Sequence, residues 1–363
     1  MPIDSGQPSK LAYQLFGLKL TAQSRATSLK GASQAAITRQ YEPTDSRIKG
    51  ELHDHIDGKI VNSIEPHNSE KCNYTAYDKD NNIGLVQLWG TREALEDREV
   101  TGTILDAAGQ FNETDWKNVL NKTIDALQKK VKEDNQGSCL LVNIIHKDTI
   151  VTVNLGDSTA YLVVIDANDS ATTTRLNRIL HKPSVKEEYE RLTAFAEEKK
   201  LNINELVPTG YEGYLQVINN KLGGRLAISG AIGDNRFDAL GLRHTPDIYY
   251  KKLALAKGAR AFVLTACDGL TEPSDMEKVI GKLVAQHKHQ TPDVIAKHLG
   301  LEALNQGSED NISVIITPID LKDEHIKYTA IFDGHGGDRV SEELCKHFHE
   351  ELNYQAQVRL RLK

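Results

Sequence analysis

Short apolar runs separated by polar turns dominate the middle of the chain. Three runs rich in β-branched residues lie within 139–166 and are separated by turns at 146–148 and 156–158. This pattern predicts three strands connected as an antiparallel meander. Two further apolar runs, 260–267 and 311–319, have the length and composition of buried strands.

Helical periodicity marks five longer segments. They are 114–132, 184–200, 273–286, 291–304 and 339–351. The first is preceded by Asn112, a favoured N-cap residue, and the fourth begins with Thr291 followed by Pro292. The strands do not alternate with single helices, so a doubly wound parallel sheet fits poorly. Antiparallel strands with paired helices favour an α+β fold in which helical layers cover the sheets.

The N-terminal part has a different composition from the rest. Residues 5–41 contain five Lys or Arg and no acid, together with many small polar residues. We predict a poorly defined extension over 1–49, with an organellar transit peptide as the alternative. Residues 50–80, rich in His, Asp and Asn, mark the boundary with a core domain over 50–363.

Composition excludes several classes of protein. A net charge of −7 over 363 residues argues against a nucleic-acid partner. No apolar run is long enough for a transmembrane segment, and no secretory signal pattern opens the chain. The four cysteines lack metal-binding spacing and are interpreted as free thiols in a reducing, cytoplasmic compartment. They are Cys72, Cys139, Cys267 and Cys345.

Carboxylates recur at the ends of apolar strands. Asp268 follows one strand, Asp310 precedes another, Asp333 follows "YTAIF", and Glu96-Asp97 follows "GLVQLWGTREAL". A rigid sheet can aim side chains from its strand ends at a common point. Clustered carboxylates repel one another unless a cation compensates, and an all-oxygen cluster suits Mg²⁺, Mn²⁺ or Ca²⁺.

Seven motifs give the chain a specific resemblance. They are "GTREALED" (90–97), "GDSTA" (156–160), "HKPS" (181–184), "AISGAIGD" (227–234), "ACDGL" (266–270), "GSEDNISVI" (307–315) and "FDGHGG" (332–337). Together they resemble the metal-dependent serine/threonine protein phosphatases of type 2C. The resemblance implies a central antiparallel β-sandwich flanked by helix pairs and a phosphorylated protein as substrate.

The resemblance also implies a centre of two Mn²⁺ or Mg²⁺ ions. Asp333 would bridge both ions, and the other protein ligands would be the Gly334 carbonyl, Asp268 and Asp310. Glu96 would hold metal-bound water. Paired ions activate water for attack on a phosphate monoester, so no cysteine nucleophile is needed.

Further roles follow from the same resemblance. Arg92 matches the phosphate-binding arginine, and its planar guanidinium suits a phosphate dianion. His335 matches the general acid that protonates the leaving Ser or Thr oxygen. A third ion would fall to Asp157 and Glu272. Substrate choice is expected to depend on a variable flap within 184–225 and on the N-terminal extension.

The chain departs from the family pattern at several places. Gly230 stands where the family usually has Arg, Leu180 where an acid is common, and Glu272 where an Asp is frequent. The DGHGG segment, which the family places ahead of its first long helix, is appended near the C-terminus here. This order is that of a partly permuted chain.

The permuted segment raises a structural hypothesis. We expect strand 311–319 and the strand ending at Asp333 to form a hairpin through 320–327. An antiparallel pair would bring Asp310 and Asp333 to the same end of one sheet. The helix over 339–351 would then cover that sheet.

Two rival functions remain open. A catalytically silent, phosphatase-like binding module would use the same fold without turnover. A zinc-dependent, deaminase-like hydrolase is indicated by the HxH segment 51–59, which contains His53 and His55. That reading needs further ligands at later strand ends, and His146 and His181 lie in a turn and a loop instead.

Overall fold

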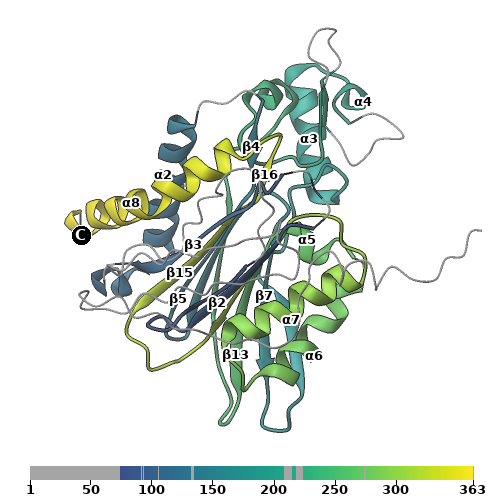
Figure 1. The fold of residues 1–363 in the computed structure, drawn as a ribbon. Helices are drawn as coiled ribbons and strands as arrows, with labels where there is room; N and C mark the ends of the chain where they lie inside the picture. Colours follow the sequence, from purple (N-terminus) through teal and green to yellow (C-terminus); the bar gives the residue numbers. More distant parts are fainter. Residues whose placement is uncertain are drawn as a thin grey trace, which may run out of the picture.

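The fold was analysed in a computed structural model. It describes residues 74–90, 92, 94–104, 106–131, 135–207, 215–217, 224–273 and 275–362. The N-terminal extension, His53, His55 and Cys72 lie outside the described residues. Two antiparallel sheets stack face to face, and paired helices cover their outer faces (Figure 1).

The first sheet has six strands, and each strand pairs antiparallel with its neighbours. In spatial order they are β1 (Tyr74–Asp78), β2 (Ile83–Leu88), β14 (Ile312–Pro318), β13 (Arg260–Ala266), β7 (Thr159–Ile165) and β8 (Ala171–Arg175). Helices α6 (Met276–His287) and α7 (Pro292–Asn305) pack on its outer face and share one apolar core with it. The short helix α5 (Asp268–Thr271) follows β13.

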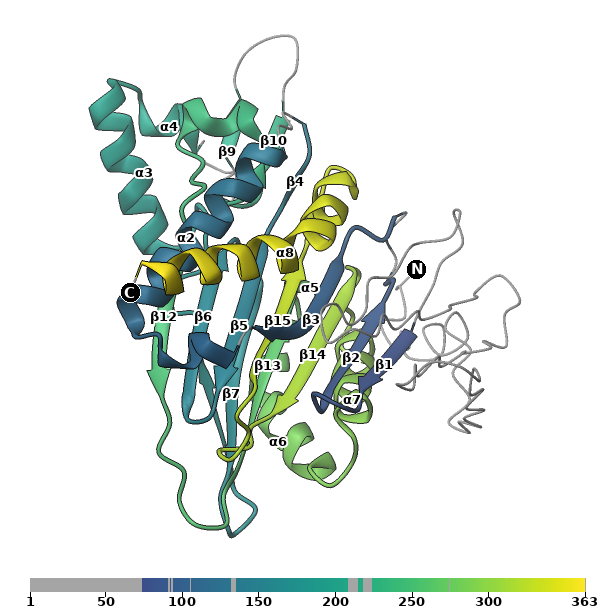
Figure 2. The same cartoon turned by 90° about the vertical axis from the view of Figure 1, so that its left-hand side faces the viewer.

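The second sheet has five strands, also antiparallel throughout. In spatial order they are β12 (Asp247–Lys252), β6 (Thr149–Leu155), β5 (Leu140–His146), β15 (Ile326–Phe332) and β3 (Arg98–Ile104). Helices α2 (Glu113–Lys130) and α8 (Arg339–Arg361) cross its outer face (Figure 2). The α+β sandwich expected from the sequence is confirmed.

Shorter elements complete the part of the chain that the structure describes. A small sheet joins β11 (Ile232–Gly233), β4 (Gly137–Ser138) and β16 (Gly334–His335). Two short 3₁₀ helices are η1 (Asp106–Gln110) and η2 (Asn235–Leu240). Helices α3 (Lys186–Lys199) and α4 (Ile203–Leu206) lie with the paired strands β9 (Leu215–Val217) and β10 (Gly224–Leu226) beyond one end of the sandwich (Figure 2). Side chains of this last group share an apolar cluster with Phe237 of η2 and with Cys139, just ahead of β5.

Strand β15 shows why both faces of the second sheet are apolar. Tyr328, Ala330 and Phe332 belong to the core beneath α2 and α8. Ile331, on the opposite face, packs with residues of the first sheet. Because side chains alternate along a strand, a strand buried on both faces reads as a continuous apolar run.

A buried polar cluster ties the two sheets together. Asn143 donates to Thr265 Oγ1 at 2.9 Å and accepts from Thr152 Oγ1 at 2.6 Å. The hydroxyls of Thr265 and Thr329 lie 2.8 Å apart. All four side chains are buried, so these hydrogen bonds satisfy groups that water does not reach.

The predicted helices are all present, and Asn112, the expected N-cap residue of α2, takes part in a capping box. Asn112 accepts from the Asp115 N–H at 2.9 Å, and the Asp115 carboxylate accepts from the Asn112 N–H at 3.0 Å. Helix α8 extends ten residues beyond the predicted end at 351, to Arg361. No helix in the described part combines the length and apolar character needed to cross a membrane.

Two strand connections differ from the prediction. β5 and β6 form the expected hairpin, but β7 pairs with β13 and β8 in the other sheet. The meander is therefore interrupted at Gly156, whose φ of 128° lets the chain turn from one sheet to the other.

The predicted hairpin between β14 and β15 is also wrong. Both edges of β14 are taken by β13 and β2, while β15 pairs with β3 and β5. The connection between them crosses from sheet to sheet. The other part of the prediction is confirmed, because the C-terminal strand is inserted into the sheet and α8 covers it.

Candidate active site

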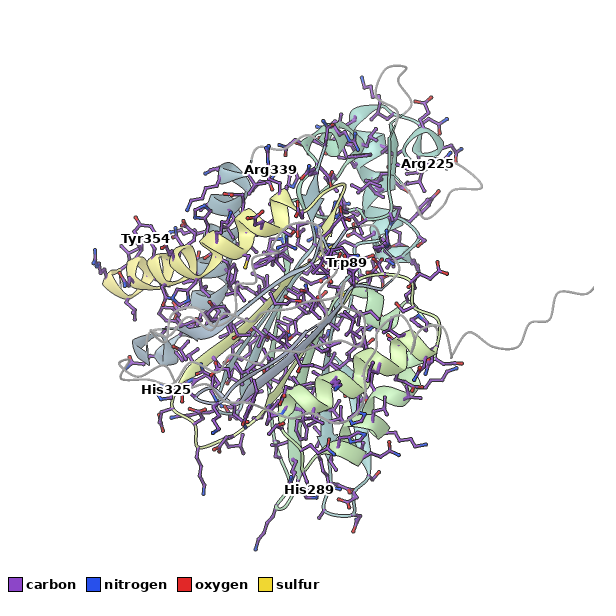
Figure 3. All side chains as sticks on the ribbon, in the orientation of Figure 1. Trp89, Arg225, His289, His325, Arg339 and Tyr354 are labelled. Atoms are coloured by element: carbon purple, nitrogen blue, oxygen red, sulfur yellow. The ribbon has the colours of Figure 1, made fainter. Side chains whose placement is uncertain are left out.

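Four aspartates come from four strand ends at one end of the sandwich. Asp333 follows β15, Asp268 follows β13, Asp157 lies just beyond β6, and Asp310 lies just ahead of β14. Trp89, which follows β2, marks this end, whereas His325 and His289 lie at the opposite end (Figure 3). The two sheets thus deliver acids to one place without a hairpin between β14 and β15.

Strand register sets the neighbours of Asp333. Phe332 lies opposite Arg98 in the β15–β3 pair, so Asp333 follows on beside Asp97 and Glu96. The Asp333 carbonyl accepts from the Cys139 N–H at 2.8 Å. Asp333 is thereby fixed between β3 and the start of β5.

The acids repel one another. Burial, with the charges of Asp157, Asp333 and Asp310, raises the pKa of Asp268 well above its usual range. Burial, with the charges of Asp97, Asp157 and Asp310, does the same for the pKa of Asp333. Burial also raises the pKa of the half-buried Glu96. A cation placed among these acids would relieve the repulsion.

The donor set fits divalent metal ions. It offers several carboxylates in a confined space, which is the chemistry that hard divalent cations prefer. Asp97 Oδ2 is buried with no hydrogen-bond partner among the described residues, so it is available to a ligand of the cluster. One group brings sulfur as well, because ligand atoms of Cys139, Asp157 and Asp333 lie within 4.8 Å of one another.

Two cationic side chains border the acids. Arg92, whose side chain is 54% exposed, forms a close ion pair with Asp310. Lys182 Nζ lies 3.0 Å from Asp157 Oδ2. Burial lowers the pKa of Lys182, but the charges of Asp157 and Asp268 outweigh it and raise the pKa above its usual value. Lys182 was missed by the sequence analysis, although it lies within the "HKPS" motif.

His335 lies at the edge of the cluster and has a buried partner. Its Nε2 is in close contact with Asp234 Oδ2, and Asp234 is almost fully buried. A Cβ on Gly137, in β4, would overlap both groups, so the close approach of this strand to the pair favours glycine. Asp234 ends the "AISGAIGD" motif, but nothing in the sequence indicates that it contacts His335.

Glu272 and Asp157 have different partners in the structure. Glu272 accepts from the Ser308 hydroxyl at 3.0 Å and from the Glu309 N–H at 2.9 Å, so it braces the loop ahead of Asp310. Asp157 instead accepts a hydrogen bond from Cys139 and pairs with Lys182.

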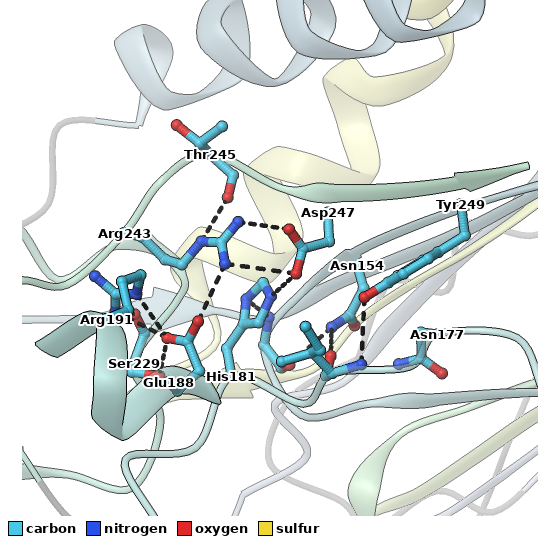
Figure 4. Close-up of polar contacts among 12 residues, drawn as sticks. Asn154, Asn177, His181, Glu188, Arg191, Ser229, Arg243, Thr245, Asp247 and Tyr249 are labelled. Atoms are coloured by element: carbon cyan, nitrogen blue, oxygen red, sulfur yellow. Dashed lines mark hydrogen bonds and ion pairs between the residues drawn. The ribbon is translucent and has the colours of Figure 1, made fainter. Parts of the chain in front are cut away.

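The turn at Gly156, which begins the "GDSTA" motif, is anchored by a buried histidine (Figure 4). The Gly156 N–H donates to His181 Nδ1 at 3.1 Å, and His181 Nε2 donates to Asp247 at 3.0 Å. A Cβ on Gly230 would lie 2.5 Å from His181 Nδ1 and 3.0 Å from Arg243 Cγ. The absence of an arginine side chain at position 230 therefore has a steric reason.

Arg243 continues this network into α3 (Figure 4). It pairs with Asp247 at 2.8 Å and with Glu188 at 3.1 Å. Glu188 also binds Arg191 at 2.8 Å and the Ser229 hydroxyl at 2.6 Å. Burial would raise the pKa of Asp247, but hydrogen bonds from His181 and Arg243 outweigh it and lower that pKa to about 2.

Comparison with known proteins identifies the family. The model of the family described as Protein phosphatase 2C matches residues 89–312, well over half of the chain. The chain belongs to the protein phosphatase 2C family. The match includes Arg92, Asp268 and Asp310 but ends before Asp333 and His335, in agreement with the unusual position of the C-terminal segment.

Curated relatives are distant. The chain is 27% identical over 212 residues to the integrin-linked kinase-associated serine/threonine phosphatase 2C of Bos taurus, covering 52% of this chain and 48% of that protein. It is 27% identical over 195 residues to probable protein phosphatase 2C 8 of Arabidopsis thaliana, covering 52% of each. The chain spans about half the length of the curated relatives it matches.

Similar solved structures include two from Toxoplasma gondii. A serine-threonine phosphatase 2C is 16% identical with a TM-score of 0.45, covering 66% of this chain and 94% of that one. A phosphatase from a pathogenic strain is 20% identical with a TM-score of 0.45, covering 69% and 96%.

Proposed function

We propose that this protein is a metal-dependent phosphoprotein phosphatase that hydrolyses phosphoserine and phosphothreonine. The observation that carries the proposal is the convergence of four strand-end aspartates beside Arg92 and His335. Family membership supports the reaction class. The rival deaminase reading rests on His53 and His55, outside the described residues, and gains no support from the comparisons.

The acids would hold two Mn²⁺ or Mg²⁺ ions. The proposed ligands are Asp333, the Gly334 carbonyl, Asp268 and Asp310, with Glu96 in an outer position. When bound, such ions activate water and neutralise charge on the phosphate. Asp157 is available to a third ion, with Lys182 as its competitor.

Arg92 would capture the phosphate. Its guanidinium is half exposed and already lies at the acid cluster, paired with Asp310. A planar guanidinium can donate two parallel hydrogen bonds to phosphate oxygens. Binding of cations at Asp310 would free Arg92 for this role.

His335 would donate a proton to the leaving oxygen. A Ser or Thr alkoxide is a poor leaving group, so a positioned acid lowers the barrier to its departure. The contact with Asp234 fixes the orientation of the imidazole. Asp234 is therefore proposed as a positioning residue.

Substrate choice is assigned to residues 184–225, as a variable flap on a catalytic domain over 50–363. Within this region α3 is tied to the site through Glu188 and Arg243. The phosphoprotein substrate would approach over this group of helices.

The test is phosphate release from phosphothreonine and phosphoserine peptides with Mn²⁺ or Mg²⁺. Turnover by the wild type, and its loss in Asp333→Asn, would support the proposal. If the wild type binds cations in calorimetry but releases no phosphate, the result favours the hypothesis of a catalytically silent binding module.

A further inference from the structure

The register of β5 places a thiol inside the acid cluster. Leu140 lies opposite Leu155 in β6, and Leu141 lies opposite Ile331 in β15. Cys139, just ahead of β5, therefore lies between the residues that follow those two strands. Those residues are Asp157 and Asp333.

The sulfur lies close to both carboxylates, because the ligand atoms of Cys139, Asp157 and Asp333 are within 4.8 Å of one another. Cys139 Sγ donates to Asp157 Oδ1 at 3.3 Å, and the Cys139 N–H donates to the Asp333 carbonyl at 2.8 Å. Cys139 is only 2% exposed. A Cβ on Gly156 would overlap the sulfur, so the glycine is needed to leave space for it.

The sulfurs of the other two described cysteines have different hydrogen-bond partners, although burial and the charges of Asp97, Asp333 and Asp268 together raise the pKa of the Cys267 thiol. Cys267 Sγ accepts from the Ser313 N–H at 3.1 Å and donates to the Asn311 carbonyl at 3.2 Å. Cys345 lies on α8 with its sulfur 3.6 Å from the Glu99 carbonyl. Among the described cysteines, only Cys139 lies with two carboxylates in a group that could hold a metal ion.

We propose that Cys139 is a sulfur ligand of the metal centre, joining Asp157 and Asp333 in binding thiophilic divalent cations such as Zn²⁺, Cd²⁺ and Co²⁺. The inference rests on the proposed metal centre and adds a donor to it. As the metal–sulfur bond forms, the thiol proton now donated to Asp157 leaves to solvent. Thiolate sulfur favours these ions over Mg²⁺, so the centre would select differently from an all-oxygen site.

The competing cation at this position is Lys182. Its ammonium lies 3.0 Å from Asp157 Oδ2, and Asp157 Oδ1 is the oxygen that accepts from the thiol. A bound dication would replace this ammonium as the charge partner of Asp157. Lys182→Met should therefore strengthen Cd²⁺ binding.

The test is a titration of metal-free protein with Co²⁺ and Cd²⁺, followed by ultraviolet absorption and calorimetry. Wild type should develop a sulfur-to-metal charge-transfer band at one equivalent. Cys139→Ser should lose that band and bind Cd²⁺ at least ~10-fold more weakly, with little change for Mg²⁺. Cys345→Ser should keep the band.

Thermal melting without metal shows whether each variant is folded, and Cys139→Ala provides a second variant without a hydroxyl. A band that persists in both Cys139 variants, or wild type that binds Cd²⁺ without a band, would overturn the sulfur ligand. Absence of any cation binding by wild type would instead contradict the proposed metal centre as a whole.

Discussion

The imidazole of His335 is held by the buried carboxylate of Asp234, a residue 101 positions earlier in the chain. The two residues come from different motifs and meet where β16 and β11 flank β4. The C-terminal segment thus contributes His335 to a site whose other residues come from earlier parts of the chain.

Asp234→Asn should impair the proposed proton donation without removing His335. We expect turnover of phosphoserine peptides to fall by ~10–100-fold, part of the usual contribution of a general acid. Aryl phosphates should be affected much less, because a phenolate leaves without protonation. The measurement is kcat on both substrates, and equal losses would argue against the role of the pair.

Asp268→Asn should stabilise the metal-free protein. Burial and three neighbouring carboxylates disfavour the charge of Asp268, and the amide removes that charge. A gain of about 1 kcal/mol would raise the melting temperature by roughly 2–4 °C for a large domain. Melting in chelator measures it. Asp125→Asn on the exposed face of α2 is the control, and a lower melting temperature only in Asp268→Asn would contradict the electrostatic account.

Asp247→Asn tests the network beneath α3. The pKa of Asp247 is lowered to about 2 from 3.8, so its charge stabilises the fold at pH values above 3.8. That contribution is lost as the pH falls towards 2, and it amounts to about 2 kcal/mol. Denaturant unfolding at a series of pH values should show the variant weaker at neutral pH, with a difference that narrows in acid. A difference independent of pH would show that lost packing, not charge, is responsible.

The relocated segment should also fold in the order typical of the family. Ile326 lies opposite Ile104 at the open ends of β15 and β3, so a short turn could join them. At the C-terminal end of the relocated segment, Arg359 on α8 binds Asp115 at the start of α2 at 2.8 Å. Moving residues 324–362 between Ile104 and Asp106, with short linkers, should therefore preserve the fold and the activity.

Circular dichroism and phosphate release check this rearranged chain. Its control is truncation after Asp320, which removes β15 and leaves β3 and β5 without their shared partner, so we expect insoluble protein. If the rearranged chain is as insoluble as the truncated one, the inferred equivalence of the two orders is wrong.

Local signals in the sequence were sufficient to predict the helices and to locate the acids at the strand ends. Asn112 and the apolar spacing after it define α2, and Asp268, Asp310 and Asp333 were each found at a strand end. The sequence does not indicate which sheet a strand joins, because β7, β14 and β15 have the same apolar pattern although they belong to different sheets. A strand buried on both faces gives no sign of which partner it will choose.

Contacts between motifs that lie far apart in the chain could not be predicted from the sequence either. From the sequence, Cys139 is interpreted only as a free thiol, and only the register of β5 against β6 and β15 places it among the acids. Lys182 and Asp234 lay inside recognised motifs, but their partners became clear only in three dimensions. The sequence shows that Gly230 departs from the family pattern. The reason is that His181 and Arg243 occupy the space beside it, and this depends on packing.

The most direct test of the central claim is chelation followed by restoration of metal, measured as phosphate release from a phosphothreonine peptide. Wild type stripped of metal should be inactive, and Mn²⁺ or Mg²⁺ should restore its activity, while Asp333→Asn should stay inactive at every metal concentration. Phosphate release by wild type that persists after exhaustive chelation, or full activity of Asp333→Asn, would contradict the account.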